Sequence, residues 1–286
     1  MKNRHSFLLI ILAVLVLAYP IFIGFSPCHI ELKQENIKIA MPIIMYHQVL
    51  KGKSGMYIVT PEQLESDLKM FKAQGFNFVL PSQMIDFVEG KGELPKKPIL
   101  ICFDDGHYNN IYYAYPLLKK YQAKALFNII GVFSNNSSYS GSLSNPDYSH
   151  MTWSEIRNLN TDECMELGNH SYNMHNYRPR FGISKLPEET TAQYIKTLTD
   201  DIMHMQSKMA NQCGVIPTVF AYPFGKYTVE GQQLLPKLGF KMTLNCNEGV
   251  TKIKWGEPKS LFDLRRINRS GLLCSTEILL KIKKYY

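Results

Sequence analysis

The chain has 286 residues, of which 32 are basic and 24 acidic, so its net charge at pH 7 is +8. No basic run with interleaved aromatic residues occurs, which argues against a nucleic-acid-binding protein. The six cysteines form no Cys-x-x-Cys pair, which argues against a structural zinc site. The positive charge is compatible with attraction to anionic wall polymers or lipid headgroups, and equally with simple solubility.

The first segment of the chain has the pattern of a membrane anchor. Two basic residues precede an uncharged, mostly apolar run at 7–25, which is long enough to cross a bilayer as a helix. The basic residues favour a cytoplasmic N-terminus, so the rest of the chain would face outward. A cleaved signal peptide is the alternative, but no Ala-x-Ala-like site follows the run. We therefore expect an anchor or uncleaved signal at 1–27, a polar stalk at 28–40 and one domain at 41–286.

The remainder of the chain alternates short apolar runs with helical patterns. Helices are predicted after two capping boxes, at 60–63 and 152–155, and over the long stretch 188–209. Such alternation favours parallel strands. About seven units predict a distorted (β/α) barrel, in which catalytic groups lie at the carboxyl ends of the strands. The predicted strands are 43–45, 78–80, 99–103, 125–130, 166–168, 218–221 and 241–244. Shorter helices are predicted at 229–238 and 276–284, and a loop at 134–149.

One predicted strand ends in two adjacent carboxylates. Asp104 and Asp105 follow the apolar run 99–103, and Gly106 comes next. Like charges side by side repel, and burying either one is costly unless a cation or hydrogen bonds compensate. Such a pair is typical of a site in which one carboxylate binds a metal and the other transfers a proton. A strand-ending Asp-Gly turn explains the same residues equally well.

Two histidines in a short polar loop, His170 and His175, are candidate partners for this pair. With one aspartate they would make a three-ligand metal site that leaves positions open for water and substrate. Their spacing of five places them on different faces of a helix and on opposite faces of a strand. Both can reach one ion only from an irregular loop, for which Gly168, Asn169 and Asn173 are suitable. A surface or packed histidine is the alternative role for each.

Together these residues resemble the polysaccharide deacetylases, the NodB-homology group also called carbohydrate esterase family 4. Residues 102–106 are similar to the S/T-F-D-D-G motif of the family. Residues 170–175 are similar to its H-S/T-x-x-H motif with one residue added, and 220–225 to its R-x-P-Y/F-G motif. Two further stretches also resemble the family, at 42–47 and 151–156.

The sequence departs from most members of this family in two respects. Ala221 stands where they have an arginine that orients the catalytic aspartate, and no histidine follows His204 to act as a C-terminal general acid. The resemblance is closer to the circularly permuted branch, the poly-N-acetylglucosamine de-N-acetylases. That branch has its acid histidine on the first strand and its metal histidines five apart, as His47 and the two loop histidines are here.

The resemblance implies a catalytic role for each candidate polar residue. Asp105, His170 and His175 would bind a divalent metal ion, with zinc favoured and cobalt or nickel as alternatives. Asp104 would take a proton from the attacking water, and His47, protonated, would donate one to the leaving amine. A packed core histidine beside Tyr46 is the alternative role for His47.

Four further residues receive roles from the same resemblance. Tyr222, Pro223 and Phe224 would contact the sugar, although hydrophobic packing is the alternative for the two aromatic side chains. A backbone N–H near Tyr222 is a candidate for holding the oxyanion. Arg266 is a candidate substitute for the missing arginine that orients the base.

The implied reaction is removal of N-acetyl groups from an N-acetylglucosamine-containing polysaccharide outside the cell, with release of acetate. Poly-N-acetylglucosamine and peptidoglycan are both possible substrates. An O-acetyl polysaccharide esterase would use the same residues, and a non-catalytic carbohydrate-binding relative is the second alternative. The expected partners are this polysaccharide and the membrane, without nucleic acid. The expected location is the cell membrane, with one span and the domain outside, or secretion if the first segment is cleaved.

Overall fold

The computed structural model describes residues 37–141 and 143–286. The predicted membrane anchor and most of the predicted stalk lie outside the described residues. Within the described ranges, no helix combines the length and the apolar character needed to span a bilayer. The end of the predicted stalk requires a correction, because it forms strand β1 (Lys38–Met41), which pairs antiparallel with β11 (Thr251–Lys254). Its partner lies more than 200 residues away along the chain, so the local pattern gives no sign of the pairing.

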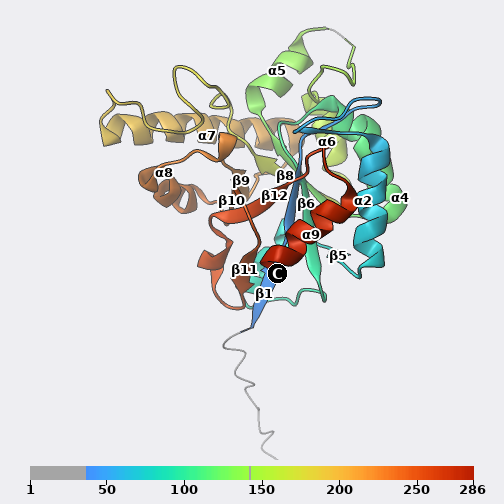
Figure 1. Ribbon diagram of the computed structural model, residues 1–286. Coiled ribbons are helices and arrows are strands. Elements are labelled where there is room, and N and C mark those ends of the chain that lie inside the picture. Colours follow the sequence, from blue (N-terminus) through green and yellow to red (C-terminus); the bar gives the residue numbers. More distant parts are fainter. Residues whose placement is uncertain (1–36, 142) are drawn as a thin grey trace, which may run out of the picture. The chain divides into compact units, whose positions relative to one another are not determined.

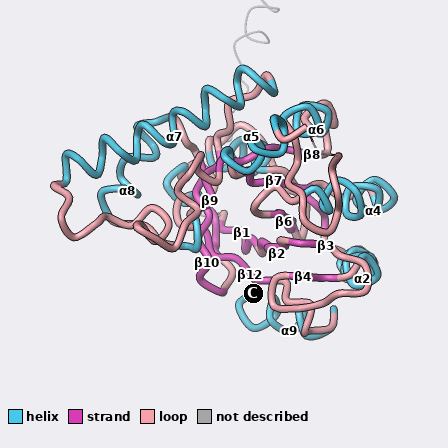
Figure 2. The backbone as a smooth tube through the Cα atoms, turned by 90° about the horizontal axis from the view of Figure 1, so that it is seen from above, coloured by secondary structure: helices cyan, strands magenta, loops and turns pink. Residues whose placement is uncertain are grey.

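Seven parallel strands close into a barrel, as predicted, and Figure 2 shows them as a ring surrounded by helices. In order around the barrel they are β2 (Ile43–Tyr46), β6 (Pro98–Phe103), β7 (Ala125–Ile129), β8 (Met165–Asn169), β9 (Val219–Ala221), β10 (Met242–Glu248) and β12 (Leu264–Asn268). Pairing of β12 with β2 completes the ring. The short strand β5 (Asn77–Phe78) adds to the start of β6, and β3 (Gln48–Val49) pairs with β4 (Ile58–Val59).

Alternation along each strand divides its side chains between the inside of the barrel and the helical layer. In β6, Leu100 and Cys102 belong to the inner apolar cluster, whereas Ile99, Ile101 and Phe103 pack with the surrounding helices. All five side chains are fully buried. Strands that are covered on both faces are apolar at every position, which is why this run is recognisable in the sequence.

Helices cover the outer surface of the barrel (Figure 1). They are α2 (Pro61–Ala73), α3 (Pro81–Val88), α4 (Tyr115–Tyr121), α5 (Gly131–Tyr139), α6 (Trp153–Leu159), α7 (Thr191–Cys213), α8 (Val229–Leu234) and α9 (Ser275–Tyr285). Short turns of other helical types lie at η1 (Asn110–Ala114), η2 (Pro223–Gly225), η3 (Leu235–Leu238) and η4 (Pro258–Leu261). The predicted capping boxes are confirmed: Thr60 with Gln63 begins α2, and Thr152 with Glu155 begins α6.

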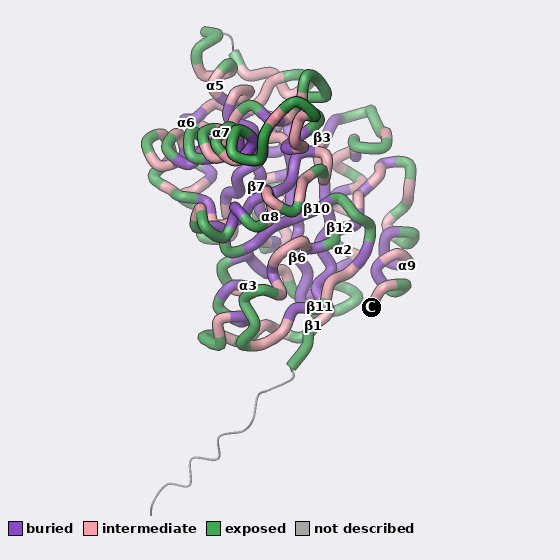
Figure 3. Tube along the Cα trace, turned by 90° about the vertical axis from the view of Figure 1, so that its left-hand side faces the viewer, coloured by how far each residue is buried: buried purple, intermediate pink, exposed green. Residues whose placement is uncertain are grey.

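The amino end of the barrel is closed by apolar side chains from outside the ring. Met84 and Phe87 of α3, Ile253 of β11 and Leu261 of η4 all belong to the inner cluster. Figure 3 shows α3, β1 and β11 at one end of the buried strands, with α5 at the other. The functional residues are therefore expected at the carboxyl end of the strands, where the polar motifs lie.

Some elements differ from those predicted. Helix α5 occupies the start of the predicted loop 134–149, and neither α3 nor α4 is foreseen by the sequence analysis. The most consequential omission is β12, in which two consecutive arginines interrupt the apolar pattern by which the other strands are recognised. Arg265 is exposed and Arg266 is buried, as expected for neighbours on opposite faces of a strand.

Candidate active site

The carboxyl ends of the barrel strands surround a cavity of about 560 Å³. Asp104 and Asp105 reach it from the end of β6, and His47 from the end of β2. His170 follows β8, and His175 lies in the loop beyond it. Residues separated by more than 120 positions along the chain thus share one cavity. The barrel topology brings them together because all of its strands point the same way.

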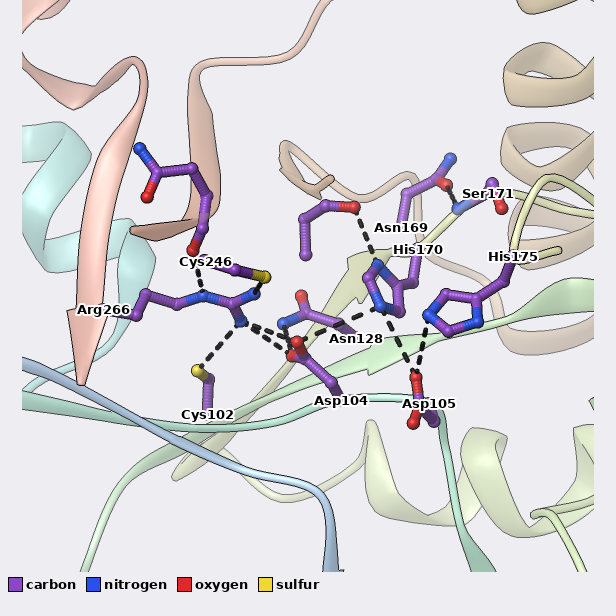
Figure 4. A network of polar contacts seen from close by, with 12 residues as sticks. Cys102, Asp104, Asp105, Asn128, Asn169, His170, Ser171, His175, Cys246 and Arg266 are labelled. Atoms are coloured by element: carbon purple, nitrogen blue, oxygen red, sulfur yellow. Dashed lines mark hydrogen bonds and ion pairs between the residues drawn. The ribbon is translucent and has the colours of Figure 1, made fainter. Parts of the chain in front are cut away.

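Three of these side chains form a group that could hold a metal ion. Oδ1 of Asp105 lies 3.5 Å from Nε2 of His170 and 3.4 Å from Nε2 of His175. One donor atom from each residue lies within 4.8 Å of the others, and the described part of the chain contains no other such group. Figure 4 shows both imidazoles directed at the Asp105 carboxylate.

Two observations show that this group fits a cation. Nδ1 of His170 lies 2.7 Å from the carbonyl oxygen of Ala221, so it carries the proton, which leaves the lone pair of Nε2 facing Asp105. Oδ1 of Asp105 is buried and has no hydrogen-bond donor among the described residues. A buried carboxylate oxygen without a donor is costly, and a bound cation would remove that cost.

The charges of the group also favour a cation. Burial opposes ionisation of Asp105, but contacts with His107 and His170 hold its pKa well below the usual range. Burial likewise opposes protonation of His170, but its contact with Asp105 and the charges of Asp104 and Asp105 raise its pKa, because the two carboxylates attract positive charge to this point. For His175, burial and then the neighbouring His170 lower the pKa to about 4. The His175 imidazole is therefore neutral at neutral pH, so one of its two nitrogens has a lone pair available for a cation.

The five-residue spacing of the histidines is accommodated by an irregular loop, as predicted. Ser171 has a positive φ of 69°, and its N–H donates to Oδ1 of Asn169 at 2.8 Å. The next two N–H groups, those of Tyr172 and Asn173, each donate to the Asp201 carboxylate of α7 at 2.8 Å. One carboxylate on a long helix thus fixes the backbone between the two histidines.

The Asp-Gly turn, which the sequence offered as an alternative explanation of this pair, is present. Asp105 and Gly106 both have a φ of +73°. This left-handed conformation is strained for a residue other than glycine, although aspartate tolerates it better than most. The turn directs Asp105 toward the histidines, while Asp104 continues the inner face of β6.

Asp104 lies at the centre of a buried hydrogen-bond network (Figure 4). Nη1 of Arg266 donates to both of its oxygens, at 2.9 and 2.8 Å, and Nδ2 of Asn128 donates to Oδ1 at 2.7 Å. Burial alone would raise the pKa of Asp104, but the Arg266 charge, with smaller effects of His170 and His47, lowers it. The carboxylate is therefore ionised at neutral pH although its side chain is almost completely buried.

Arg266 is held in turn by atoms of two other strands, β6 and β10. Its Nε donates to the carbonyl oxygen of Asn245 at 2.7 Å, and its terminal nitrogens lie 3.5 Å from the sulfurs of Cys102 and Cys246. The contact expected between Arg266 and Asp104 is present. Its function in orienting a base stays a prediction.

His47 borders the same cavity from the opposite side. Its ring packs edge-on against Tyr57 at a centroid distance of 4.8 Å. Its Nδ1 is buried without a hydrogen-bond partner among the described residues. Burial lowers the pKa of His47, against the opposing effect of the Asp105 and Asp104 charges.

The three residues expected to contact the sugar separate in the structure. Phe224 lines the cavity, and its ring lies 4.1 Å from that of His175. Tyr222 is fully buried in the outer apolar cluster with Phe220, and neither it nor Pro223 lines the cavity. The prediction that these two side chains contact the sugar is therefore corrected: neither reaches the cavity. Ala221, at the end of β9, belongs to the inner cluster, whereas Tyr222, the next residue, points outward. The N–H of Tyr222 also donates to a carbonyl of β10, so it is not free to hold an oxyanion.

The comparison with known families agrees with this arrangement. The sequence model described as polysaccharide deacetylase matches residues 91–243. The chain belongs to the polysaccharide deacetylase family. The matched region contains the two aspartates that follow β6 and both loop histidines, whereas β2 and β12 lie outside it.

Several curated relatives are similar to this chain over most of its length. A putative polysaccharide deacetylase, YxkH of Bacillus subtilis, is 24% identical over 80% of this chain and 71% of its own. A poly-beta-1,6-N-acetyl-D-glucosamine N-deacetylase of Escherichia coli is 24% identical over 67% of this chain but only 31% of its own. A Staphylococcus aureus protein with that same name is 26% identical over 67% of this chain and 62% of its own. The chain therefore spans less than two thirds of either poly-N-acetylglucosamine deacetylase.

Solved structures show the same fold. A de-N-acetylase from Aggregatibacter actinomycetemcomitans superposes with a TM-score of 0.72 over 85% of this chain and 100% of its own, at 19% sequence identity. At this identity the likeness concerns the fold alone.

The structure adds residues that sequence reasoning missed. Asn128 is a lone polar residue within the apolar strand β7, and this break in pattern is a signal that could have revealed it. His107 comes two residues after the metal-ligand candidate and lines the cavity. Tyr177 and Phe181 also line the cavity, and they lie in a loop that no motif marks.

Proposed function

We propose that the chain is a metal-dependent N-deacetylase that removes acetyl groups from an N-acetylglucosamine-containing polysaccharide and releases acetate. The observation that supports this most is the presence of an ion-binding group, Asp105 with His170 and His175, beside a separate buried carboxylate, Asp104. Hydrolysis of an amide requires both an electrophilic centre and a base. A site that only bound carbohydrate would need no second carboxylate at the same place.

The metal-binding group suits zinc, because zinc prefers imidazole and carboxylate ligands in small numbers with positions left open. Cobalt and nickel accept the same donors. An ion held by Asp105, His170 and His175 would polarise the acetamide carbonyl and acidify a water molecule.

Asp104 is the proposed general base. Its Oδ2 lies 3.9 Å from Nε2 of His170, so the carboxylate borders the metal-binding group without joining it. Arg266 and Asn128 fix its orientation and keep it ionised, as the network of contacts indicates. It would accept a proton from the water that attacks the acetamide carbon.

His47 is the proposed general acid. It lies on the far side of the cavity from the loop histidines and donates a proton to the amine nitrogen as the C–N bond breaks. Its buried Nδ1, which has no hydrogen-bond partner among the described residues, supports a contact with substrate. Burial lowers the pKa of His47 and so opposes its protonated form, whereas the charges of Asp105 and Asp104 act in the opposite direction and favour that form.

The substrate is proposed from the cavity wall and from the names of the relatives. Phe224, Tyr177 and Phe181 have ring centroids 4.5 to 5.5 Å apart, and their wall continues outward from His175. Tyr177 lines the cavity and is 72% exposed, so its ring is accessible to a ligand there. Apolar ring faces of this kind suit the C–H faces of pyranose sugars. Two relatives are named for poly-N-acetylglucosamine, which makes that polymer the first choice and peptidoglycan the second.

We place the domain on the outer surface of the cell membrane, held by the apolar run at 7–25. Fractionation of cells that express the full chain tests this, with protease added to intact cells. Protection of the domain from protease would contradict the placement, and its release into the medium would indicate cleavage.

The function is tested by measuring acetate release from defined N-acetylglucosamine oligomers, from peptidoglycan and from an O-acetylated polysaccharide. We expect N-acetyl substrates to be preferred, activity to be lost with a chelator, and activity to return with zinc, cobalt or nickel. Preference for O-acetyl substrates would support the esterase alternative. Binding of oligomers without acetate release would support a non-catalytic relative.

A further inference from the structure

A histidine beside the metal-binding group contacts the oxygen of Asp105 that faces away from it. Nε2 of His107 lies 3.5 Å from Oδ2 of Asp105, whereas Oδ1 faces His170 and His175. An ionised carboxylate only accepts hydrogen bonds, so this contact is a hydrogen bond when Nε2 of His107 carries the ring proton. The two oxygens of Asp105 thus have different partners.

The ring of His107 is itself held in place from the opposite side of the site. His107 forms a backbone bridge with His150, and the two rings stack at a centroid distance of 4.7 Å with 27° between their planes. The ring of Phe133 in α5 packs on His150 at 4.5 Å. Backbone hydrogen bonds of 2.9 Å on either side of the bridge tie the segments 106–108 and 149–151 together.

The stack of His107 and His150 does not form a second metal site. In the described part of the chain, Asp105, His170 and His175 are the one group of three or more such residues whose donor atoms lie within 4.8 Å of one another. His107 has 14% of its side chain exposed and reaches Asp105 through a single nitrogen. His107 is therefore placed to contact Asp105, a candidate metal ligand, and is not placed to bind the metal ion itself.

We propose that His107 is a positioning residue, which holds Asp105 so that Oδ1 alone is presented to a divalent cation. The proposal rests on the metal-binding role given above to Asp105, His170 and His175. Groups that hydrogen-bond a ligating carboxylate fix its orientation, and their loss typically weakens metal affinity by about 10- to 100-fold. Without His107, the Asp105 side chain would be free to rotate and to offer both oxygens. The stack on His150 and Phe133 makes this contact a built feature of the barrel mouth.

Zinc affinity of the purified full chain tests the proposal, measured by competition with a chromophoric chelator. We expect His107→Leu to bind zinc about 10- to 100-fold more weakly than the parent protein. His107→Gln keeps an N–H donor at a similar distance and should recover most of the affinity. His150→Phe keeps an aromatic ring against His107 but has no nitrogen, so its zinc affinity should equal that of the parent.

A second readout separates positioning from a general loss of structure. The visible absorption spectrum of the cobalt-loaded protein reports the geometry of the ligands, and we expect it to change in His107→Leu and to be preserved in His107→Gln and His150→Phe. Unchanged zinc affinity and an unchanged cobalt spectrum in His107→Leu would overturn the proposal. An equal loss in His150→Phe, or two zinc ions per parent chain, would also overturn it, because both results indicate ligation by these histidines. If the parent binds no zinc, the metal-dependent function itself fails.

Discussion

Two buried aspartate–arginine pairs lie on opposite sides of the barrel wall. Arg266 in β12 faces inward to Asp104, and Arg269, just after β12, pairs with Asp67 of α2. All four side chains are at most 2% exposed. The two pairs therefore have the same chemistry and the same burial, but their surroundings differ.

The outer pair is closed on itself. Arg269 donates to both oxygens of Asp67, at 2.6 and 3.1 Å, and the Tyr46 hydroxyl donates to the same carboxylate at 2.8 Å. The remaining nitrogen of Arg269 donates to the carbonyl of Leu273 at 2.9 Å. Every strong donor and acceptor is used within the pair and its neighbours. Such a network fixes the end of β2 against α2 and against the segment 270–273 that precedes α9.

The inner pair is open on one side. Asp104 borders the cavity beside His170, and Nη1 of Arg266 donates to both oxygens of Asp104. A buried ion pair therefore indicates function only where one partner also faces a cavity. We expect the inner pair to govern activity and the outer pair to govern stability.

The largest expected effect is on the rate of acetate release by Asp104→Asn. This substitution keeps the shape of the side chain and removes the proposed base, so the rate should fall by about 10²- to 10⁴-fold. Acetate release from N-acetylglucosamine oligomers measures it, with the folded fraction determined in parallel because Arg266 loses its partner. A rate near that of the parent would contradict the claim that the inner pair governs activity.

The next effect concerns the outer pair. Asp67→Asn leaves the buried charge of Arg269 unpaired, which should lower the free energy of unfolding by about 3–5 kcal/mol. Urea denaturation measures this. The rate of acetate release per folded molecule should fall far less than in Asp104→Asn. Loss of activity in Asp67→Asn with an unchanged denaturation midpoint would contradict the claim that the outer pair governs stability.

A smaller effect is expected at the helix that holds the metal-binding loop. The carboxylate of Asp201 accepts hydrogen bonds from two N–H groups, and the amide oxygen in Asp201→Asn can accept only one of them. A hydrogen bond to a charged group contributes about 1.5–3 kcal/mol. We expect a lower unfolding temperature and weaker zinc binding. The matched control is Asp200→Asn, which loses only an exposed ion pair with Lys196 and should change neither quantity. Equal effects of the two variants would show that the loop is not held by Asp201.

The smallest effect is expected on the open side of the inner pair, at the aromatic wall. Tyr177→Ala should raise KM for long oligomers by about fivefold, because a stacked aromatic pair contributes about 0.5–1.5 kcal/mol. The rate constant kcat should change little. Tyr139→Ala, which removes a similarly exposed ring outside the cavity wall, is the control. A kcat loss in Tyr177→Ala without a change in KM would contradict substrate stacking.

Much of this arrangement could be predicted from the sequence because its strands are apolar on both faces. The runs that end at Tyr46, Phe103 and Ala221 are recognisable for that reason, and the candidate residues follow them directly. The irregular loop could also be predicted, since a spacing of five leaves no regular structure that directs both histidines to one point.

The failures have equally specific causes. Strand β12 escaped prediction because it carries two arginines, although one of them lies inside the barrel. Sugar contact was assigned to Tyr222 from its motif, whereas the alternation of a three-residue strand turns its ring outward. The contacts of His107 and Tyr177 depend on loops whose course is set by distant packing, which no local pattern shows.

In the proposed arrangement, Asp105, His170 and His175 share one ion, while Asp104 remains unbound beside it. Anomalous diffraction at the zinc edge, from crystals grown with zinc, tests it most directly. We predict one peak per chain, about 2.0–2.2 Å from Oδ1 of Asp105 and from Nε2 of each histidine. Absence of a peak at this position, or a zinc ion bound by Asp104, would contradict this arrangement.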